Sequence, residues 1–173
     1  MKKLLFVAVC LISFVAPACA YQAPGNFKLS LWEDIAFSIP DNIYNIKGAD
    51  LGIGSKSYTL TGLQWDILWA NSTYLTGLSW AWAASKTSKA TGAQMAFVTL
   101  SDQITGAQLG AVNLSFYDVV GAQIGFYNQA ERITGAQVGF VNYAKHIHGL
   151  QLGIFNIAEN GYLPAMVFVN GRF

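Results

Sequence analysis

Cysteine is almost absent from this sequence of 173 residues. The two cysteines, Cys10 and Cys19, both lie among the first twenty residues, which have a basic start, an apolar run and an A-x-A cleavage site ending at Ala20. These are the parts of a secretory signal. We therefore predict a signal peptide over residues 1–20 and a mature chain from Tyr21 onward that folds without any disulfide.

Charge is also scarce, because charged residues make up 11% of the chain and apolar residues 53%, against roughly 25% charged residues in soluble domains. Without Lys2 and Lys3 the ten Lys and Arg residues become eight, against nine Asp and Glu. This near-balance gives no electrostatic reason to expect a nucleic-acid partner. Past residue 20, no apolar run approaches the roughly 18 residues of a membrane-spanning helix. A secreted, charge-poor and aromatic-rich chain of this kind is typical of an outer-membrane β-barrel.

Motifs of known enzyme chemistry are missing too, since no phosphate-binding loop, metal signature or nucleophile elbow occurs. His146 and His148 are the only histidines, and two ligands without a third nearby make a poor metal site. A catalytic grouping of a serine, one of these histidines and Asp118 has no support from their spacing. We predict no catalytic, cofactor-binding or metal site.

A repeat dominates the rest of the sequence, from about residue 47 to residue 162. Its clearest copies read TGAQLGAVN, VGAQIGFYN, TGAQVGFVN and HGLQLGIFN. Each of the eight copies starts at a glycine, with a spacing of 14 or 15 residues. These glycines are Gly48, Gly62, Gly77, Gly92, Gly106, Gly121, Gly135 and Gly149. A period this constant indicates a repeat architecture.

Each copy has two chemically different faces when it is read as an extended strand, in which alternate side chains point the same way. With the glycine as position one, positions two, four and six are apolar in every copy, and we call these residues the apolar face. The apolar face consists of Ala49, Leu51, Ile53, Leu63, Trp65, Ile67, Leu78, Trp80, Trp82, Ala93, Met95, Phe97, Ala107, Leu109, Ala111, Ala122, Ile124, Phe126, Ala136, Val138, Phe140, Leu150, Leu152 and Ile154. Position three holds Asp50, Gln64, Ser79, Gln94, Gln108, Gln123, Gln137 and Gln151. Apolar residues at every second position indicate strands and not an amphipathic helix.

The connections between copies contain short polar segments, such as residues 101–103, 129–132 and 143–146, which predict tight turns between antiparallel strands. An opening strand over residues 27–37 and a closing strand over residues 163–173 raise the number of strands to about ten. We therefore expect an all-β fold, a single repeat-built domain over residues 21–173, in which an antiparallel meander closes as a small outer-membrane β-barrel.

The barrel places the apolar face on lipid and position three inside, so that Asp50 and Asp66 also point inward and Gln side chains pack the interior. A charge on the lipid side of such a barrel is costly. We therefore expect Leu109→Arg to be far more damaging than Gln108→Ala.

A β-solenoid of 14–15-residue coils is the alternative fold. In it the apolar face forms the core, and a flat Gln/Asn/Gly face lies outside. Near-identical copies favour this fold, because parallel stacking places each residue on its counterpart. Volume argues against it, since four tryptophans between residues 65 and 82 would crowd one end of the core while Ala107 and Ala111 left another part thin.

The G-[LAV]-Q-x-G-x-x-N units, the opening LSLW segment and the closing segment that ends in Phe173 resemble the bacterial surface-repeat proteins of spirochaetes and other Gram-negative bacteria. The likeness is strongest from residue 91 to residue 173. The early copies differ, because Asp50 and Ser79 replace the Gln, and Asp66 and Ala81 replace the second Gly. The resemblance implies an exported, surface-associated protein and brings no catalytic residues.

The expected function is accordingly that of a non-enzymatic outer-membrane or cell-surface repeat protein with a structural or interaction role. Its expected partners are outer-membrane lipid and an unknown surface ligand. Two alternatives remain open: an exported, adhesin-like β-solenoid and a small lipid-modifying outer-membrane enzyme.

Overall fold

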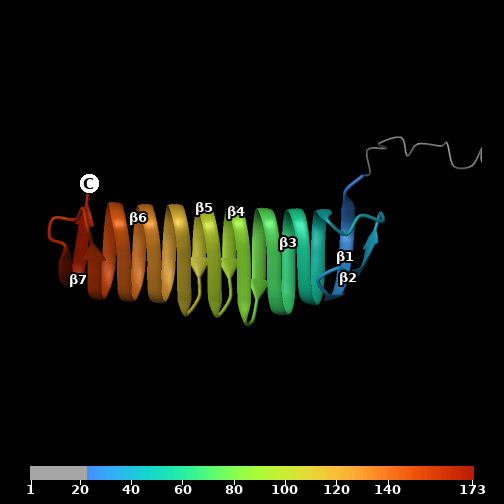
Figure 1. The fold of residues 1–173 in the computed structure, drawn as a ribbon, viewed down its shortest axis with the longest axis horizontal. Coiled ribbons are helices and arrows are strands. Elements are labelled where there is room, and N and C mark those ends of the chain that lie inside the picture. Colours follow the sequence, from blue (N-terminus) through green and yellow to red (C-terminus); the bar gives the residue numbers. More distant parts are fainter. Residues whose placement is uncertain (1–22) are drawn as a thin grey trace, which may run out of the picture.

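The computed structural model describes residues 23–173, and the predicted signal peptide lies outside these residues. The described chain is all-β, as predicted, and it winds repeatedly about one long axis (Figure 1). Its strands are β1 (Gly25–Trp32), β2 (Ile35–Ile39), β3 (Asn45–Ala81), β4 (Ala84–Met95), β5 (Val98–Leu109), β6 (Val112–Ala158) and β7 (Ala165–Arg172). The long strands β3 and β6 contain several repeat copies each. The fold is a β-solenoid.

Consecutive repeat copies stack in parallel and in register. Gly77 pairs with Gly92, Gly92 with Gly106, and Gly106 with Gly121. The predicted antiparallel barrel is therefore wrong, and the alternative fold is the one observed. Residues 101–103, 129–132 and 143–146, predicted as turns, lie inside β5 and β6, because their charged side chains point outward from a strand that continues around the coil.

Antiparallel strands close both ends of the solenoid, in the sheet order β2-β1-β3-β4-β5-β6-β7. The predicted opening strand is a hairpin in which β2 pairs antiparallel with β1, and β1 then pairs parallel with β3. At the other end β7 pairs antiparallel with β6 and confirms the predicted closing strand. Residues 159–161 form a turn after β6.

The two faces of the repeat point in directions opposite to those expected for a solenoid, because position three points inward and the apolar face points outward. Every position-three residue is completely buried, and Asp66 is buried beside them, which confirms the inward orientation of both aspartates. Trp65, Trp80 and Trp82 lie outside and are 41%, 42% and 65% exposed. The expectation that tryptophans would crowd one end of a solenoid core was wrong, because these side chains lie on the outer surface.

The interior of the solenoid contains one apolar row and several rows of small or polar side chains. The apolar row consists of Ile46, Leu60, Leu75, Ala90, Ile104, Val119, Ile133 and Ile147. A second buried row contains Ser72, Thr87, Ser101, Ser115, Ala130, Ala144 and Ala158. The position-three amides and the asparagines Asn113, Asn128, Asn142 and Asn156 form two more rows, and all are fully buried. A core this polar is stable only if its amides are hydrogen-bonded.

The buried glutamines form a hydrogen-bonded ladder along the solenoid axis. Gln123 Nε2 donates to Gln108 Oε1 at 2.8 Å, Gln137 Nε2 to Gln123 Oε1 at 2.7 Å, and Gln151 Nε2 to Gln137 Oε1 at 2.7 Å. The same Nε2 groups also donate to the backbone oxygens of residues 129, 143 and 157, at 3.0–3.1 Å. Each amide therefore links two coils and also holds its own coil closed.

The buried asparagines form a parallel ladder, in which Asn113 Nδ2 donates to Asn128 Oδ1, Asn128 Nδ2 to Asn142 Oδ1, and Asn142 Nδ2 to Asn156 Oδ1, each at 2.8 Å. Two contacts explain the second glycine of the motif. A Cβ atom on Gly139 would overlap the carbonyl oxygen of Gly125 in the preceding coil and would lie 2.5 Å from Asn128 Nδ2 of the ladder.

The first glycine of each copy has its own steric cause. Gly121, for example, has a φ of +134°, and a Cβ atom there would overlap the carbonyl oxygen of Gly106 in the preceding coil. Side chains are disfavoured at such φ values, and backbone cannot move away as a flexible side chain can. The close spacing of the coils therefore requires glycine at this position.

The expectation for Gln108 and Leu109 is reversed in the solenoid. Gln108→Ala removes the acceptor of Gln123 and the donor to Gln94 and Ser101, and we expect it to lower the free energy of unfolding by about 3 kcal/mol. Leu109→Arg changes a side chain on the outer surface, and we expect an effect within about 1 kcal/mol. Urea unfolding of both variants measures this, and the opposite ranking would contradict the stacked-coil core.

Candidate functional site

The apolar face runs along all eight repeat copies of the described chain. Its side chains point away from the core, with exposed fractions of 65% for Phe97, 61% for Phe126 and 40% for Phe140. None of its members carries a charge, and its side-chain hydrogen-bond donors are the indole N–H groups of Trp65, Trp80 and Trp82. Monomeric soluble proteins rarely leave such long apolar strips uncovered, so this face is the first candidate for function.

The backbone beneath this face has little capacity to bind a partner by hydrogen bonds. Parallel pairing joins each coil to the coil before and after it through the same residues that carry the apolar side chains. The N–H and C=O groups of a paired strand are taken up by its neighbours. A partner on this face therefore meets apolar side chains and, in the second and third copies, indole N–H groups.

Aromatic side chains give the face an uneven relief. The rings of Phe126 and Phe140 stack with centroids 4.8 Å apart and an interplanar angle of 6°, and the rings of Trp80 and Trp82 lie 6.4 Å apart. In the same row as the two phenylalanines, Ala111 interrupts the large side chains. The face is thus uncharged along its whole length, but its side chains differ in how far they project from the backbone.

Ion pairs lie on the opposite side of the coils. Arg132 Nε approaches Asp118 Oδ1 at 2.6 Å, and Lys145 Nζ approaches Glu131 Oε1 at 2.9 Å. The hydrogen bond from Arg132 holds the pKa of Asp118 below its ordinary value. We call this surface the charged face. Exposed pairs of this kind contribute little stability but make the solenoid amphipathic.

The residues considered for chemistry do not converge in the structure. Asp118 is paired with Arg132. His146 lies two repeat periods after Asp118, which separates the backbones of these two residues by about 10 Å at the usual strand spacing. His146 and His148 are both exposed. Across residues 23–173, no group of three His, Cys, Asp or Glu side chains is close enough to hold a metal ion.

A buried ionic cluster near the N-terminal end was not predicted as a group. Lys28 Nζ lies 3.4 Å from Asp50 Oδ2 and donates to Lys56 O at 2.6 Å. Ser55 Oγ donates to Asp66 Oδ2 at 2.7 Å. The alternation of residues in β1 buries Lys28 and exposes Leu29. This alternation was the sequence signal that could have predicted a lysine beside the inward aspartates.

The environment of this cluster disfavours negative charge. Burial is the largest effect on Asp66 and raises its pKa from 3.8 to about 7, although the hydrogen bond from Ser55 opposes the shift. Burial also raises the pKa of Asp50, against the attraction of Lys28. The cluster fills the interior of the first two copies, where Asp50 and Asp66 replace the Gln and the second Gly of the later copies.

Chain comparisons give no family assignment: no protein-family model, no curated protein and no solved structure matches this chain. In the described part of the chain, no helix is long and apolar enough to cross a membrane.

The raised pKa of Asp66 predicts a pH-dependent stability. The unfolded chain releases this proton near pH 3.8 and the folded chain near pH 7, so folding retains a proton within that window. The free energy of unfolding should fall as pH rises from about 4 to about 7, by up to about 4 kcal/mol at 1.36 kcal/mol per pKa unit. Urea unfolding between pH 4 and 8 measures this. Asp66→Asn should reduce the slope, and the part that remains is due to Asp50, whose pKa is also raised.

The matched control is Asp118→Asn. The pKa of Asp118 lies below its ordinary value, so this carboxyl group is ionised throughout the same window. Its replacement should leave the slope unchanged. An Asp66→Asn variant with the wild-type slope would show that Asp66 does not hold the proton.

Proposed function

We propose that this chain is a non-enzymatic, exported β-solenoid of the bacterial outer membrane or cell surface, and that its apolar face binds membrane lipid. The observation that carries the proposal is the outward orientation of an uncharged face in all eight repeat copies. Export is supported by the signal sequence predicted for residues 1–20. The proposed role is structural or one of interaction.

The size of the face supports a binding role. With strands about 4.8 Å apart and residues about 3.3 Å apart along a strand, eight copies and the five residues from position two to position six cover on the order of 600 Å². The largest apolar patch of a typical monomer is about 300–600 Å² and is often functional. The face thus lies at the upper end of that range even without its flanking apolar residues.

Lipid suits this face better than an ordinary protein partner. Protein interfaces contain about one hydrogen bond per 100–200 Å², and the side-chain donors of the apolar face are three indole N–H groups confined to its second and third copies. Hydrocarbon chains need no hydrogen bonds, and fluid chains fill the space between Phe97 and Phe126 above Ala111. The charged face then points to solvent, as in amphipathic segments that lie in a membrane interface.

An exported, adhesin-like role remains the second candidate, since a second copy of the chain presents the same uncharged, largely apolar face. The uneven relief weighs against this pairing, because two rigid faces interlock only where their heights match. The third candidate, a lipid-modifying enzyme, has less support, since Asp118 binds Arg132 and not a histidine. The charged face offers a site for a surface ligand.

Charge introduced into the apolar face should weaken membrane binding. Phe126→Glu places a carboxylate among the exposed rings, and we expect the partition of the purified protein onto lipid vesicles to fall at least tenfold. A tenfold loss corresponds to about 1.4 kcal/mol, which is less than the cost of a charge within hydrocarbon. Co-sedimentation with phosphatidylethanolamine and phosphatidylglycerol vesicles measures the partition.

Phe116→Glu is the matched control, because Phe116 is similarly exposed, at 53%, but lies close to Asp118 in sequence and away from the apolar face. We expect its vesicle binding to stay within twofold of the wild type. Equal losses in both variants, or no binding by the wild type, would count against lipid. If Phe126→Glu instead dissociated a stable dimer, the second candidate would take precedence.

A further inference from the structure

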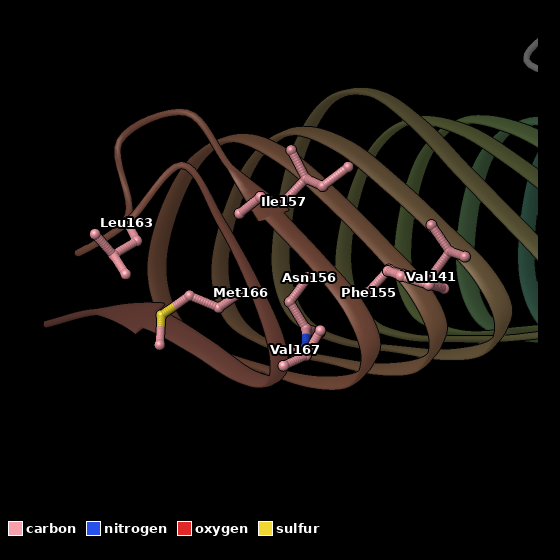
Figure 2. Close-up of a pocket in the computed structure, with 8 residues that line it drawn as sticks. Val141, Phe155, Asn156, Ile157, Leu163, Met166 and Val167 are labelled. Atoms are coloured by element: carbon pink, nitrogen blue, oxygen red, sulfur yellow. The ribbon is translucent and has the colours of Figure 1, made fainter.

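An apolar groove lies at the C-terminal end of the solenoid, beside β7 (Figure 2). Its volume is about 640 Å³, which is within the range of about 300–1,000 Å³ found for small-molecule sites. Three segments that are separate in sequence form its wall. They contribute Val141, Phe155 and Ile157 from β6, Leu163 from the loop after β6, and Met166 and Val167 from β7.

The groove exists because β7 does not continue the coil. It runs antiparallel to β6, and its pairing passes over Ile154 between Gly153 and Phe155. Phe168, opposite Gly153, has a left-handed φ of +68°, an uncommon conformation for a bulky residue. The last coil is therefore covered irregularly, and the apolar side chains of its outer surface remain accessible.

The polar groups of the groove wall are already used. Asn156 is the polar residue among those that line it, and it is fully buried. Its Nδ2 group donates to Gly153 O at 2.7 Å, and its Oδ1 atom accepts from Asn142 Nδ2 at 2.8 Å. No charged residue lines the groove. An occupant therefore meets only hydrocarbon and the thioether of Met166.

An extended peptide is a poor occupant, because the loop after β6 already covers part of the outer edge of β7. Tyr162 N donates to Gly171 O at 3.2 Å, and Asn170 Nδ2 donates to Leu163 O at 3.1 Å. Strand addition relies on free backbone groups along an edge. The groove instead favours a ligand without hydrogen-bonding groups along its length.

The groove is continuous with the apolar face. The ring of Phe155, in the groove wall, contacts the ring of Phe140 on that face, with centroids 6.2 Å apart and an interplanar angle of 65°. Phe155 and Val167 are 51% and 59% exposed, so both remain accessible at the groove. A lipid that lies against the apolar face thus reaches the groove without crossing a polar surface.

We infer that this groove holds one acyl chain of a membrane lipid, as a specific site at the end of the proposed lipid-binding face. The inference rests on the proposed function, because the bilayer supplies the lipid. It adds a defined position and a stoichiometry of one chain per protein, which a uniformly apolar face does not provide.

Photolabelling tests this site directly. The probe is palmitoyl lysophosphatidylethanolamine with a diazirine near the methyl end of its chain, used below its critical micelle concentration and, separately, within phospholipid vesicles. We expect the label to concentrate on residues 155–167 in both settings. Ala165→Trp fills the groove and should reduce this labelling at least tenfold, and Leu163→Asp should do the same by adding a charge.

Ala111→Trp is the matched control, since it makes the same substitution on the apolar face away from the groove. Its labelling of residues 155–167 should stay within twofold of the wild type, and vesicle binding of Ala165→Trp should also be retained. Label spread evenly along the apolar face, or unchanged by Ala165→Trp and Leu163→Asp, would overturn the inference. Groove labelling by the monomeric probe without vesicle binding would support the acyl site and contradict the membrane proposal.

Discussion

The hydrogen bonds between buried side-chain amides make this fold possible. Beside one row of mostly Ile and Leu side chains, the interior is filled by small and amide side chains, and an unpaired buried amide is costly. Stacking removes this cost, because each Gln and Asn meets its counterpart one coil away. The residues of the apolar face are then not needed inside. The protein consequently has a largely polar interior and an apolar outer face, the reverse of the usual arrangement.

The differences between repeat copies follow from the same contacts. Gly110, Gly125, Gly139 and Gly153 stand at position five in the copies whose asparagines form the buried ladder. Asp66, Ala81 and Ala96 take that position where Ala70, Ser85 and Thr99 replace the asparagine. The first copy, which has no asparagine, has Gly52 there because a Cβ atom would overlap the carbonyl oxygen of Ser30. The early copies are therefore not degraded repeats. They belong to a different interior, which is ionic around Lys28 and Asp50 and becomes an amide core further along the chain.

Much of the local structure was predictable, but the topology was not. Glycine spacing and alternation gave the strands, the two faces and the inward positions of Asp50 and Asp66. Period-two alternation is the same in an antiparallel meander and in a parallel solenoid, and a row of glutamines suits either interior. The assumption that Trp65 and Trp80 must lie inside any solenoid led to the barrel. The groove beside β7 depends on the register around Phe168, which no repeat pattern specifies.

The glutamine ladder has a direction, since every Nε2 group donates toward the N-terminal coil. At its last member the series ends, and Gln151 Oε1 has no hydrogen-bond partner among the described residues. A further copy of the motif inserted between β6 and β7, where Asn170 now pairs with Gln151, would bring a glutamine to that oxygen without any change to the coils before it. Because each coil depends chiefly on its neighbours, copy number is an adjustable length, and each added copy extends the apolar face by about 4.8 Å.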